Sequence, residues 1–296
     1  MVRLTQQAST LEAGVGGSEL NVAVLAARLG VPSRWVSRLP DNALGRMVAA
    51  RAREQGVDPN VDWTADGEGR VGLYFLETAG ARIGSVVYDR AGSAFSRITP
   101  GAIDWPSVFG GARWYHVSGI TPALSDGAAK ATAESLVAAK RAGLTVSYDL
   151  NFRPKLWSAT QARAAQEPLM QHVDVLIAGE EDARVIFGTD SAESLAQRFA
   201  IGAVAITLRD NPRSAGLAAD GQVYSAPRFE VATVDPIGAG DAFVGGLIVS
   251  RLERRGWDDA VRFASATAAL KHTIPGDFCL VTRKDVDELL RERVAR

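Results

Sequence analysis

Helix-like and strand-like hydrophobic patterns alternate along most of the chain. Apolar residues at helical spacing predict helices over 18–29, 41–55, 125–142, 241–254, 257–271 and 283–293. Short apolar runs predict strands over 33–39, 113–118, 144–150, 173–178 and 204–208. Strands that alternate with helices favour a mainly parallel sheet in a three-layer α/β/α arrangement. Ser18 is the expected N-cap of the first helix, which Gly30 ends.

The pattern changes between residues 57 and 92. Two β-rich runs, at 71–76 and 82–88, follow each other with only a turn between them. Such a pair reads as two antiparallel strands, because parallel strands need a longer crossover. The sequence therefore predicts a small β-sheet lid around 57–92, inserted into a single domain that spans residues 1–296.

Composition narrows the class of protein. Of the 296 residues, 47% are hydrophobic and 23% charged, and the formal net charge is −1, so we expect neither nucleic acid nor membrane as a partner. The single cysteine, Cys279, excludes an internal disulfide and fits a reducing cytoplasm. The first thirty residues show no signal-peptide pattern, and no run of eighteen apolar residues predicts a membrane span.

Polar residues gather where the predicted strands end. Asp149 and Asn151 follow one strand, and residues 179–182 (GEED) follow the next. Residues 238–241 (GAGD) precede a predicted helix. Open α/β sheets bind ligands outside the carboxyl ends of their strands, so these segments predict a polar site at one sheet edge.

The GAGD turn is suited to an anion. A helix N-terminus presents unpaired backbone N–H groups and a partial positive charge, and glycines let the backbone approach a ligand closely. Asp241 falls in the first turn of that helix. On these four residues alone, the favoured interpretation is that Asp241 caps the helix and the glycines form a tight turn.

A second glycine cluster, GVGG at residues 14–17, also precedes a helix. Its spacing does not fit the dinucleotide motif G-x-G-x-x-G, and the chain contains no G-x-x-x-x-G-K-[ST] loop. Asn21, one turn further on, is either a solvated helix residue or a hydrogen-bond partner of a polar ligand.

Three segments together resemble the ribokinase-type (PfkB-type) sugar kinases. They are GVGGSELNVAVLAARLG near the start, SYDLNFRPKLW in the middle and DPIGAGDAF near the end. The runs VGLYFLE, VVYDRAGSAFS, YHVSGITPALS and IPGDF are similar to the branch of 2-keto-3-deoxygluconate kinases. The resemblance implies a central sheet flanked by helices, with a β lid that often mediates contacts between subunits, and hence a homo-oligomer.

The resemblance also implies a mechanism. Asp241 matches the base that takes a proton from a sugar hydroxyl, which then attacks the γ-phosphate of ATP. The N–H groups of Gly238, Ala239 and Gly240 are expected to stabilise the transferred phosphoryl group. Mg²⁺ is expected on the phosphates, held largely through waters.

Further roles follow from the same resemblance. Residues that match sugar contacts are Gly16, Gly17, Asn21, Tyr74, Tyr88, Arg90, Arg153 and Asp277. Arg209 and Asn211, with Gly238 and Gly240, match the nucleotide site, and Asp182 matches an acid linked to the metal through water. Arginine suits a planar carboxylate, so Arg90 and Arg153 favour a sugar acid, 2-keto-3-deoxygluconate, phosphorylated on its terminal hydroxyl.

The chain departs from the family pattern at several positions. Pro236 replaces the threonine of D-T-x-G-A-G-D, GEED stands where N-x-x-E is usual, and LRDNPRSAG stands where the nucleotide loop usually carries G-x-x-G. Family members also open with a strand ahead of the equivalent of residues 2–4. Without it, we expect unpaired ladder groups in the sheet.

Two other functions remain open from the sequence. A fructokinase- or ribokinase-type enzyme for a neutral sugar has the same motifs but no use for the two arginines. A sugar- or nucleotide-binding homologue that has lost catalysis fits the altered GEED and LRDNP segments, whereas the intact GAGD turn opposes it. A dehydrogenase lacks its fingerprint.

Overall fold

The chain forms two compact units in a computed structural model. The structure describes residues 1–7, 10–65, 67–79, 82–209 and 213–294. Unit 1 comprises Met1–Ile98, Glu230–Gly246 and Ala266–Arg296, and unit 2 comprises Thr99–Phe229 and Leu247–Ser265. Each unit has its own sheet structure.

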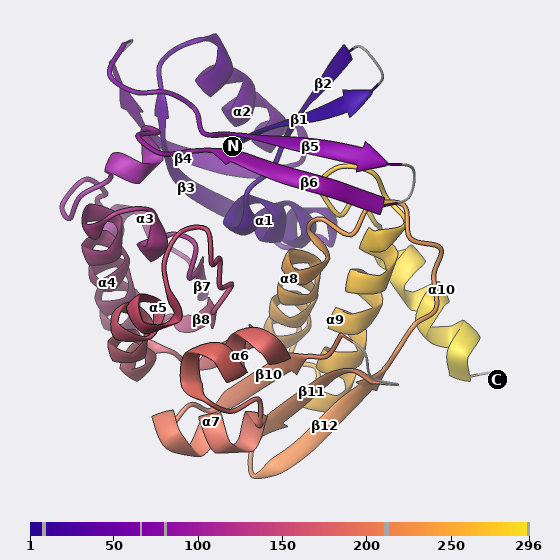
Figure 1. Ribbon diagram of the computed structural model, residues 1–296. Helices are drawn as coiled ribbons and strands as arrows, with labels where there is room; N and C mark the ends of the chain where they lie inside the picture. The colour runs from indigo at the N-terminus through magenta and orange to yellow at the C-terminus, as the bar shows by residue number, and fades with distance from the viewer. Residues whose placement is uncertain (8–9, 66, 80–81, 210–212, 295–296) are drawn as a thin grey trace. The chain divides into compact units, whose positions relative to one another are not determined.

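Unit 2 is built on a six-stranded sheet of order β12-β11-β10-β9-β8-β7 (Figure 1). Its strands are β7 (Trp114–Ser118), β8 (Thr145–Asp149), β9 (Val175–Gly179), β10 (Ala203–Thr207), β11 (Arg213–Ala219) and β12 (Gln222–Pro227). Strands β7 to β10 are parallel, whereas β11 pairs antiparallel with both of its neighbours. Asp220 and Gly221 join β11 to β12, both at positive φ (52° and 71°), as a two-residue hairpin turn requires.

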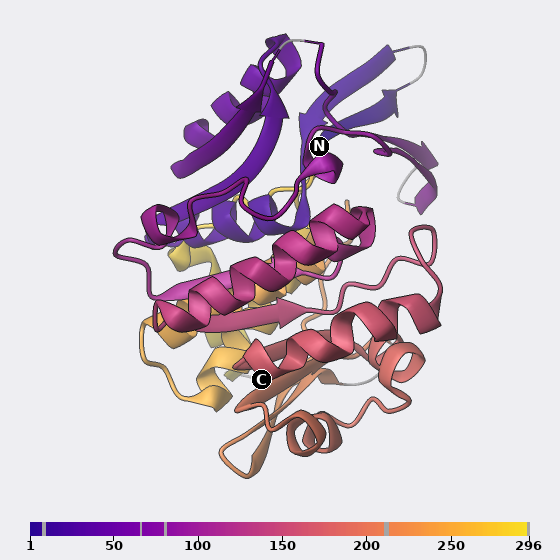
Figure 2. The same cartoon turned by 90° about the vertical axis from the view of Figure 1, so that its left-hand side faces the viewer.

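Helices of unit 2 precede the parallel strands or connect them. They are α3 (Trp105–Val108), α4 (Asp126–Arg141), α5 (Ala159–Gln166), α6 (Glu180–Phe187) and α7 (Ala192–Phe199). Short 3₁₀ segments lie at Pro122–Leu124 and Glu167–His172. The Ser125 hydroxyl accepts the N–H of Ala128 at 3.0 Å and caps α4, which packs against β8 (Figure 2).

Unit 1 contains two small sheets. One has the order β2-β1-β5-β6, from β1 (Val2–Gln7), β2 (Thr10–Val15), β5 (Leu73–Ala79) and β6 (Arg82–Asp89). The other pairs β3 (Ser33–Pro40) with β4 (Val57–Thr64) in parallel. The helices are α1 (Ser18–Arg28), α2 (Ala43–Glu54) and α10 (Arg283–Val294), and a 3₁₀ turn spans Phe95–Arg97. Helices α8 (Ala239–Leu252) and α9 (Trp257–His272) contribute to both units.

The predicted helices and strands are present, with ends shifted by a few residues. Their alternation with the parallel strands β7 to β10 confirms the expected α/β organisation, and β5 and β6 form the expected antiparallel pair. Among the described residues, no helix combines the length and apolar character needed to cross a bilayer.

The β-rich segment around residues 57–92 contributes strands to both sheets of unit 1. Residues 57–64 form β4, which pairs with β3 rather than with β5 and β6. The four-stranded sheet takes its other two strands, β1 and β2, from the start of the chain. A strand-like pattern does not identify the partner strand, because partner choice depends on tertiary packing.

Candidate active site

The Asp241 carboxylate is held on both oxygens by side chains of α1. Ser18 Oγ donates to Oδ1 at 2.6 Å, and Asn21 Nδ2 donates to Oδ2 at 2.7 Å. Ser18 and Asn21 are three residues apart, so they share one face of the helix. The prediction that Ser18 caps α1 is wrong: Gly17, at φ 153°, is the N-cap, and the Ser18 hydroxyl is directed to Asp241.

The GAG turn precedes Asp241 at the start of α8. Helix α8 begins at Ala239, two residues earlier than predicted, and Gly238 lies at φ +85°. A Cβ on Gly238 would lie 2.3 Å from the Asp277 carbonyl oxygen, so only glycine fits. The Ala239 N–H donates to Pro236 O at 3.2 Å. The hydrogen bonds of the described residues include none from the N–H groups of Gly238 and Gly240, which are therefore the better donors for an anion.

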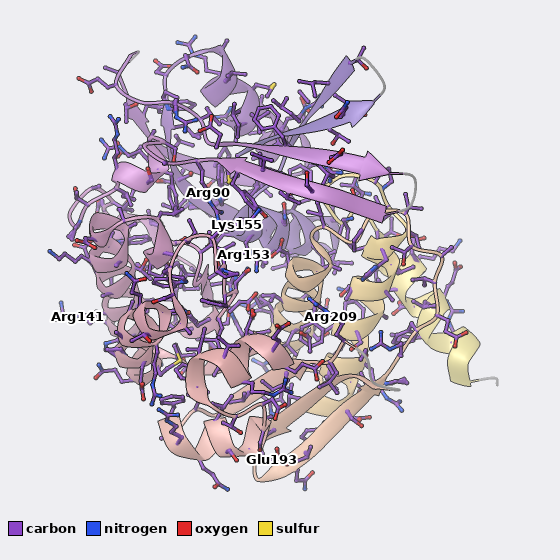
Figure 3. All side chains as sticks on the ribbon, in the orientation of Figure 1. Arg90, Arg141, Arg153, Lys155, Glu193 and Arg209 are labelled. Atoms are coloured by element: carbon purple, nitrogen blue, oxygen red, sulfur yellow. The ribbon has the colours of Figure 1, made fainter. Side chains whose placement is uncertain are left out.

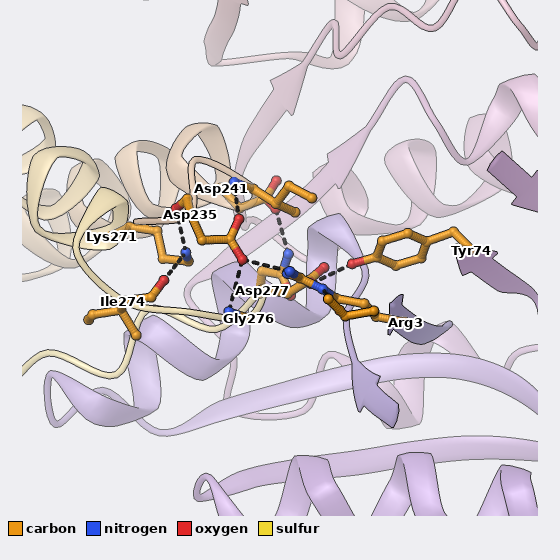
Figure 4. Close-up of polar contacts among 11 residues, drawn as sticks. Arg3, Tyr74, Asp235, Asp241, Lys271, Ile274, Gly276 and Asp277 are labelled. Atoms are coloured by element: carbon orange, nitrogen blue, oxygen red, sulfur yellow. Dashed lines mark hydrogen bonds and ion pairs between the residues drawn. The ribbon is translucent and has the colours of Figure 1, made fainter. Parts of the chain in front are cut away.

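A buried network of charged side chains lies beside this turn (Figure 4). Arg3 donates through Nη2 to Asp235 Oδ2 at 2.7 Å and through Nη1 to Asp277 Oδ1 at 3.1 Å. All three residues are only 6% exposed. Asp235 also accepts the N–H groups of Ile237 and Gly276, both at 3.0 Å. Arg3 thus joins strand β1 to the two segments that flank the GAG turn.

Tyr74 on β5 extends the network. Its hydroxyl donates a hydrogen bond to Asp277 Oδ1. Burial, together with the neighbouring Asp277, raises the pKa of Tyr74 far above its ordinary value, so the phenol stays protonated and remains a donor. Burial disfavours the charged form of Arg3 and so acts to lower its pKa. The hydrogen bond to Asp235 acts in the opposite direction, and overall the pKa of the guanidinium is raised.

Strand register places Arg3 and both predicted tyrosines on one sheet face. Gly14, Arg3, Tyr74 and Tyr88 pair across the four strands in a single row. The tyrosine rings lie 5.9 Å apart, and the Arg90 guanidinium lies 4.4 Å from the centre of the Tyr88 ring. Arg90 is 7% exposed. Arg3 and Tyr74 of this row contact Asp277, and Tyr88 and Arg90 follow next to Tyr74.

Gly16, in the glycine cluster before α1, lies against the Asp277 carboxylate. A Cβ on Gly16 would lie 1.9 Å from Asp277 Oδ2, so the chain passes directly over that carboxylate. Gly16 and Tyr74 thus meet at Asp277 within unit 1, which also holds Gly17 and Asn21 at the start of α1.

In unit 2, predicted residues meet at the carboxyl ends of β8 and β9. Asp182 Oδ2, in the first turn of α6, accepts the Phe152 N–H at 3.1 Å. Burial raises the pKa of Asp182, and the hydrogen bond from Phe152 opposes that shift. Arg153, which follows β8, is half-buried and donates to Phe152 O at 2.9 Å (Figure 3). The expected convergence of these two strand ends is confirmed.

The predicted nucleotide residues follow β10. Arg209 donates its backbone N–H to Glu180 Oε1 at 2.9 Å, while its side chain is largely exposed (Figure 3). That guanidinium is accessible to a phosphate. Asn211 lies outside the described residues.

The residues present fit a magnesium ion carried by the nucleotide. Among the described residues, no group of three or more His, Cys, Asp or Glu side chains forms a ready metal cage. Mg²⁺ usually keeps several waters and is bound by one or two carboxylates with substrate phosphates. Asp182, a half-buried carboxylate at the carboxyl ends of the strands, is the residue that would hold such an ion through water.

A carboxylate next to a glycine turn at a helix N-terminus, on an α/β frame, suits the transfer of a phosphoryl group to a hydroxyl group. The family profile described as "pfkB family carbohydrate kinase" matches residues 2–277. The chain belongs to this family and is a sugar kinase, a phosphotransferase with a hydroxyl acceptor.

Several relatives of known name are kinases of 2-dehydro-3-deoxy (2-keto-3-deoxy) sugar acids. The chain is 41% identical to a 2-dehydro-3-deoxygalactonokinase of Haloferax volcanii, with 97% of this chain and 90% of the relative covered. It is 31% identical to a 2-dehydro-3-deoxygluconokinase of Thermoproteus tenax, with 95% and 86% covered. The solved 2-dehydro-3-deoxygluconokinase of Thermotoga maritima is 35% identical, covers 98% of this chain and 97% of its own, and superposes with a TM-score of 0.91. The ribokinase-like fold class is thereby confirmed.

Three polar residues of this site have no sequence prediction: Arg3, Ser18 as a partner of Asp241, and Lys271. Ser18 carries a signal, because it lies on the same helix face as Asn21. Arg3 and Lys271 carry none, since their partners are distant in sequence or are backbone carbonyls.

Proposed function

We propose that this chain transfers the γ-phosphate of ATP to the terminal hydroxyl of a 2-keto-3-deoxy sugar acid, with Asp241 as general base. The observation that carries the proposal is the clamped Asp241 carboxylate, held by Ser18 and Asn21 at the GAG turn. Two fixed donors orient the carboxylate, and a general base must be positioned before it can act.

In this mechanism Asp241 takes the proton of the sugar hydroxyl. The hydroxyl oxygen forms a bond to the γ-phosphorus while the bond from that phosphorus to the β,γ-bridging oxygen breaks, which yields ADP and the sugar phosphate. The N–H groups of Gly238 and Gly240 stabilise the negative charge on the transferred phosphoryl oxygens. Ala239 supports the turn through its bond to Pro236.

The nucleotide and metal roles belong to unit 2 in this proposal. Arg209 is assigned to a phosphate because its side chain is exposed after β10. Asp182 is assigned to the waters of Mg²⁺, which when bound neutralises charge on the phosphates.

The sugar contacts proposed in unit 1 are Gly16, Gly17, Asn21, Tyr74, Tyr88, Arg90 and Asp277. Arg90 stands at the end of the tyrosine row and is assigned to the substrate carboxylate. Arg153 of unit 2 is also assigned to the substrate carboxylate, because of its place in the segment SYDLNFRPKLW. The named relatives support an acid, and they include both the galacto and the gluco epimer. 2-Keto-3-deoxygluconate is our proposed substrate, and the 41% identity to a galactonokinase makes its galactonate epimer the second candidate.

Kinetics on a panel of sugars tests the substrate class. We expect both keto-deoxy acids to exceed fructose and ribose in kcat/KM, because a charged hydrogen bond to the carboxylate is worth about 1.5–3 kcal/mol, or about 10- to 150-fold. Arg90→Met and Arg153→Met should each reduce that preference. Arg141→Met, which removes an exposed arginine at the end of α4, is the matched control. If kcat/KM for the neutral sugars is equal or higher, the proposal of a sugar acid substrate is wrong, and the chain is a sugar kinase of another specificity.

We also propose that the four-stranded sheet pairs with a second copy of the chain. The face opposite the tyrosine row carries Ala13, Leu4, Phe75 and Val87 in one row across all four strands. Val87 and the nearby Leu11 are each 56% exposed. An apolar row of this kind is typical of a surface that another subunit covers.

The oligomer is tested by light scattering after size exclusion. We expect the wild-type mass to be twice that of the chain or a higher multiple, and Val87→Lys to give monomer, since a charge would be buried in the interface. Val223→Lys on β12 is the control, because Val223 is equally exposed at 56% in the other unit. A monomeric wild-type protein would rule out the pairing.

A further inference from the structure

Lys271 is a buried cation that the mechanism above does not use. It lies in the last turn of α9 and is 0% exposed. Its ammonium donates to the carbonyl oxygen of Asp235 at 3.1 Å and to that of Ile274 at 2.8 Å (Figure 4). Both hydrogen-bond acceptors are therefore backbone carbonyls rather than carboxylates.

Packing alone does not account for a lysine at this position. A buried ammonium loses its hydration, and a hydrophobic residue of similar volume is often as stable or more stable in such a place. Burial lowers the pKa of Lys271. The nearby acids Asp235 and Asp277 raise it, but the effect of burial is larger, so the net pKa is lowered. A costly buried charge beside a functional turn indicates a functional role.

The two carbonyls lie on the two segments that hold the GAG turn. Asp235 stands three residues before Gly238, and Ile274 stands three residues before Asp277. A Cβ on Gly238 would lie 2.3 Å from the Asp277 carbonyl and 3.5 Å from Lys271 Cε. The Asp235 carboxylate also accepts the Gly276 N–H, and Arg3 bridges Asp235 and Asp277, so Lys271 adds a further link between the two segments.

We propose that Lys271 is a positioning residue for phosphoryl transfer. Its ammonium fixes the carbonyls of Asp235 and Ile274, which sets the orientation of the N–H groups of Gly238 and Gly240, and it places a positive charge next to the turn that receives the phosphoryl group. This inference rests on the proposed role of the GAG turn, but not on which sugar is the substrate.

Two variants of Lys271 test the proposal. Lys271→Met fills the space without a charge, and Lys271→Ala leaves a cavity lined by the two carbonyls. We expect kcat to fall by about 100-fold in both, since small displacements of a catalytic group have effects of that size, whereas KM for the sugar changes little. The thermal midpoint of Lys271→Met should be unchanged or raised, because a buried charge has been removed.

Chemical rescue separates positioning from a general packing defect. Methylammonium chloride should restore kcat of Lys271→Ala in a saturable way, because it offers N–H donors and a charge to the same carbonyls. Tetramethylammonium chloride at equal concentration has no N–H and should not. Lys271→Met, whose cavity is filled, and Val261→Ala, a packing lesion on the same helix, should show no rescue. Lys140→Met controls for the loss of a surface lysine.

The kinetic comparisons use whichever sugar the wild-type enzyme phosphorylates fastest. The effect of the Lys271 variants on kcat can then be measured even if the proposed substrate is wrong. The backbone amide signals of ¹⁵N-glycine-labelled protein, titrated with inorganic phosphate, give a second measurement without turnover. The Gly238 and Gly240 signals should respond in the wild type and respond more weakly in Lys271→Met. Near wild-type kcat in both variants, equal rescue by tetramethylammonium, or identical phosphate titrations would overturn the proposal.

Discussion

Asp241→Asn is expected to lower kcat by about 10²–10⁴-fold, the usual contribution of a general base, while the dissociation constant of the sugar changes little. Asparagine keeps the size of the side chain and its place between Ser18 and Asn21, but it cannot take a proton from the hydroxyl. Stopped-flow or steady-state turnover with the best sugar, together with calorimetric sugar binding, measures both quantities.

A matched control separates catalysis from helix capping. Asp259 also lies in the first turn of a helix, α9, and is exposed. Asp259→Asn should leave kcat near the wild-type value. If Asp241→Asn behaves the same way, Asp241 is a helix-terminal acid only and the mechanism fails. If the wild type itself shows no turnover on any sugar, the reading as a binding homologue without catalysis is favoured.

The second large effect is expected on stability. Arg3→Met should lower the free energy of unfolding by about 3–5 kcal/mol, because it leaves the Asp235 and Asp277 carboxylates buried without their cation. Urea unfolding followed by circular dichroism measures the change. Arg3→Met combined with Asp277→Asn should recover part of the loss, since one of the unpaired charges is then removed.

An exposed arginine pair calibrates this expectation. Arg34 pairs with Asp58 at 2.8 Å across β3 and β4, with side chains 41% and 61% exposed. Arg34→Met should change the free energy of unfolding by no more than about 1 kcal/mol, the range for surface ion pairs. An Arg3→Met variant as stable as Arg34→Met would mean that the buried network does not hold the two segments together.

The local elements of this protein are readable from the amino-acid sequence. The apolar pattern predicts a helix over 125–142, and the structure shows α4 there with Ser125 as its N-cap. Apolar runs followed by polar residues predict β8 and β9 and the site at their carboxyl ends, where Asp182 meets the Phe152 N–H. Such features depend on neighbours a few residues apart, so hydrophobic periodicity suffices to find them.

Within the site, the sequence determined the chemical groups: the GAG turn, Asp241 behind it, and the glycine cluster before α1. Glycine and aspartate are needed there for reasons that act locally, namely backbone conformation and charge at a helix N-terminus.

Only the tertiary structure decided which side chains meet. Ser18 reaches Asp241 across 223 residues, and Arg3 reaches Asp235 and Asp277 across 232 and 274 residues. Likewise β4 pairs with β3 rather than with the neighbouring β5, and β1 supplies Arg3 to the tyrosine row. The hydrophobic pattern of a strand predicts which face is buried, but it does not identify the strand or helix that packs against that face. A buried ion pair produces no periodic pattern in the sequence. These contacts form when packing of the core brings distant segments together. They include the hydrogen bonds of Ser18 and Asn21 to Asp241, the Arg3 network and the hydrogen bonds of Lys271 beside the GAG turn.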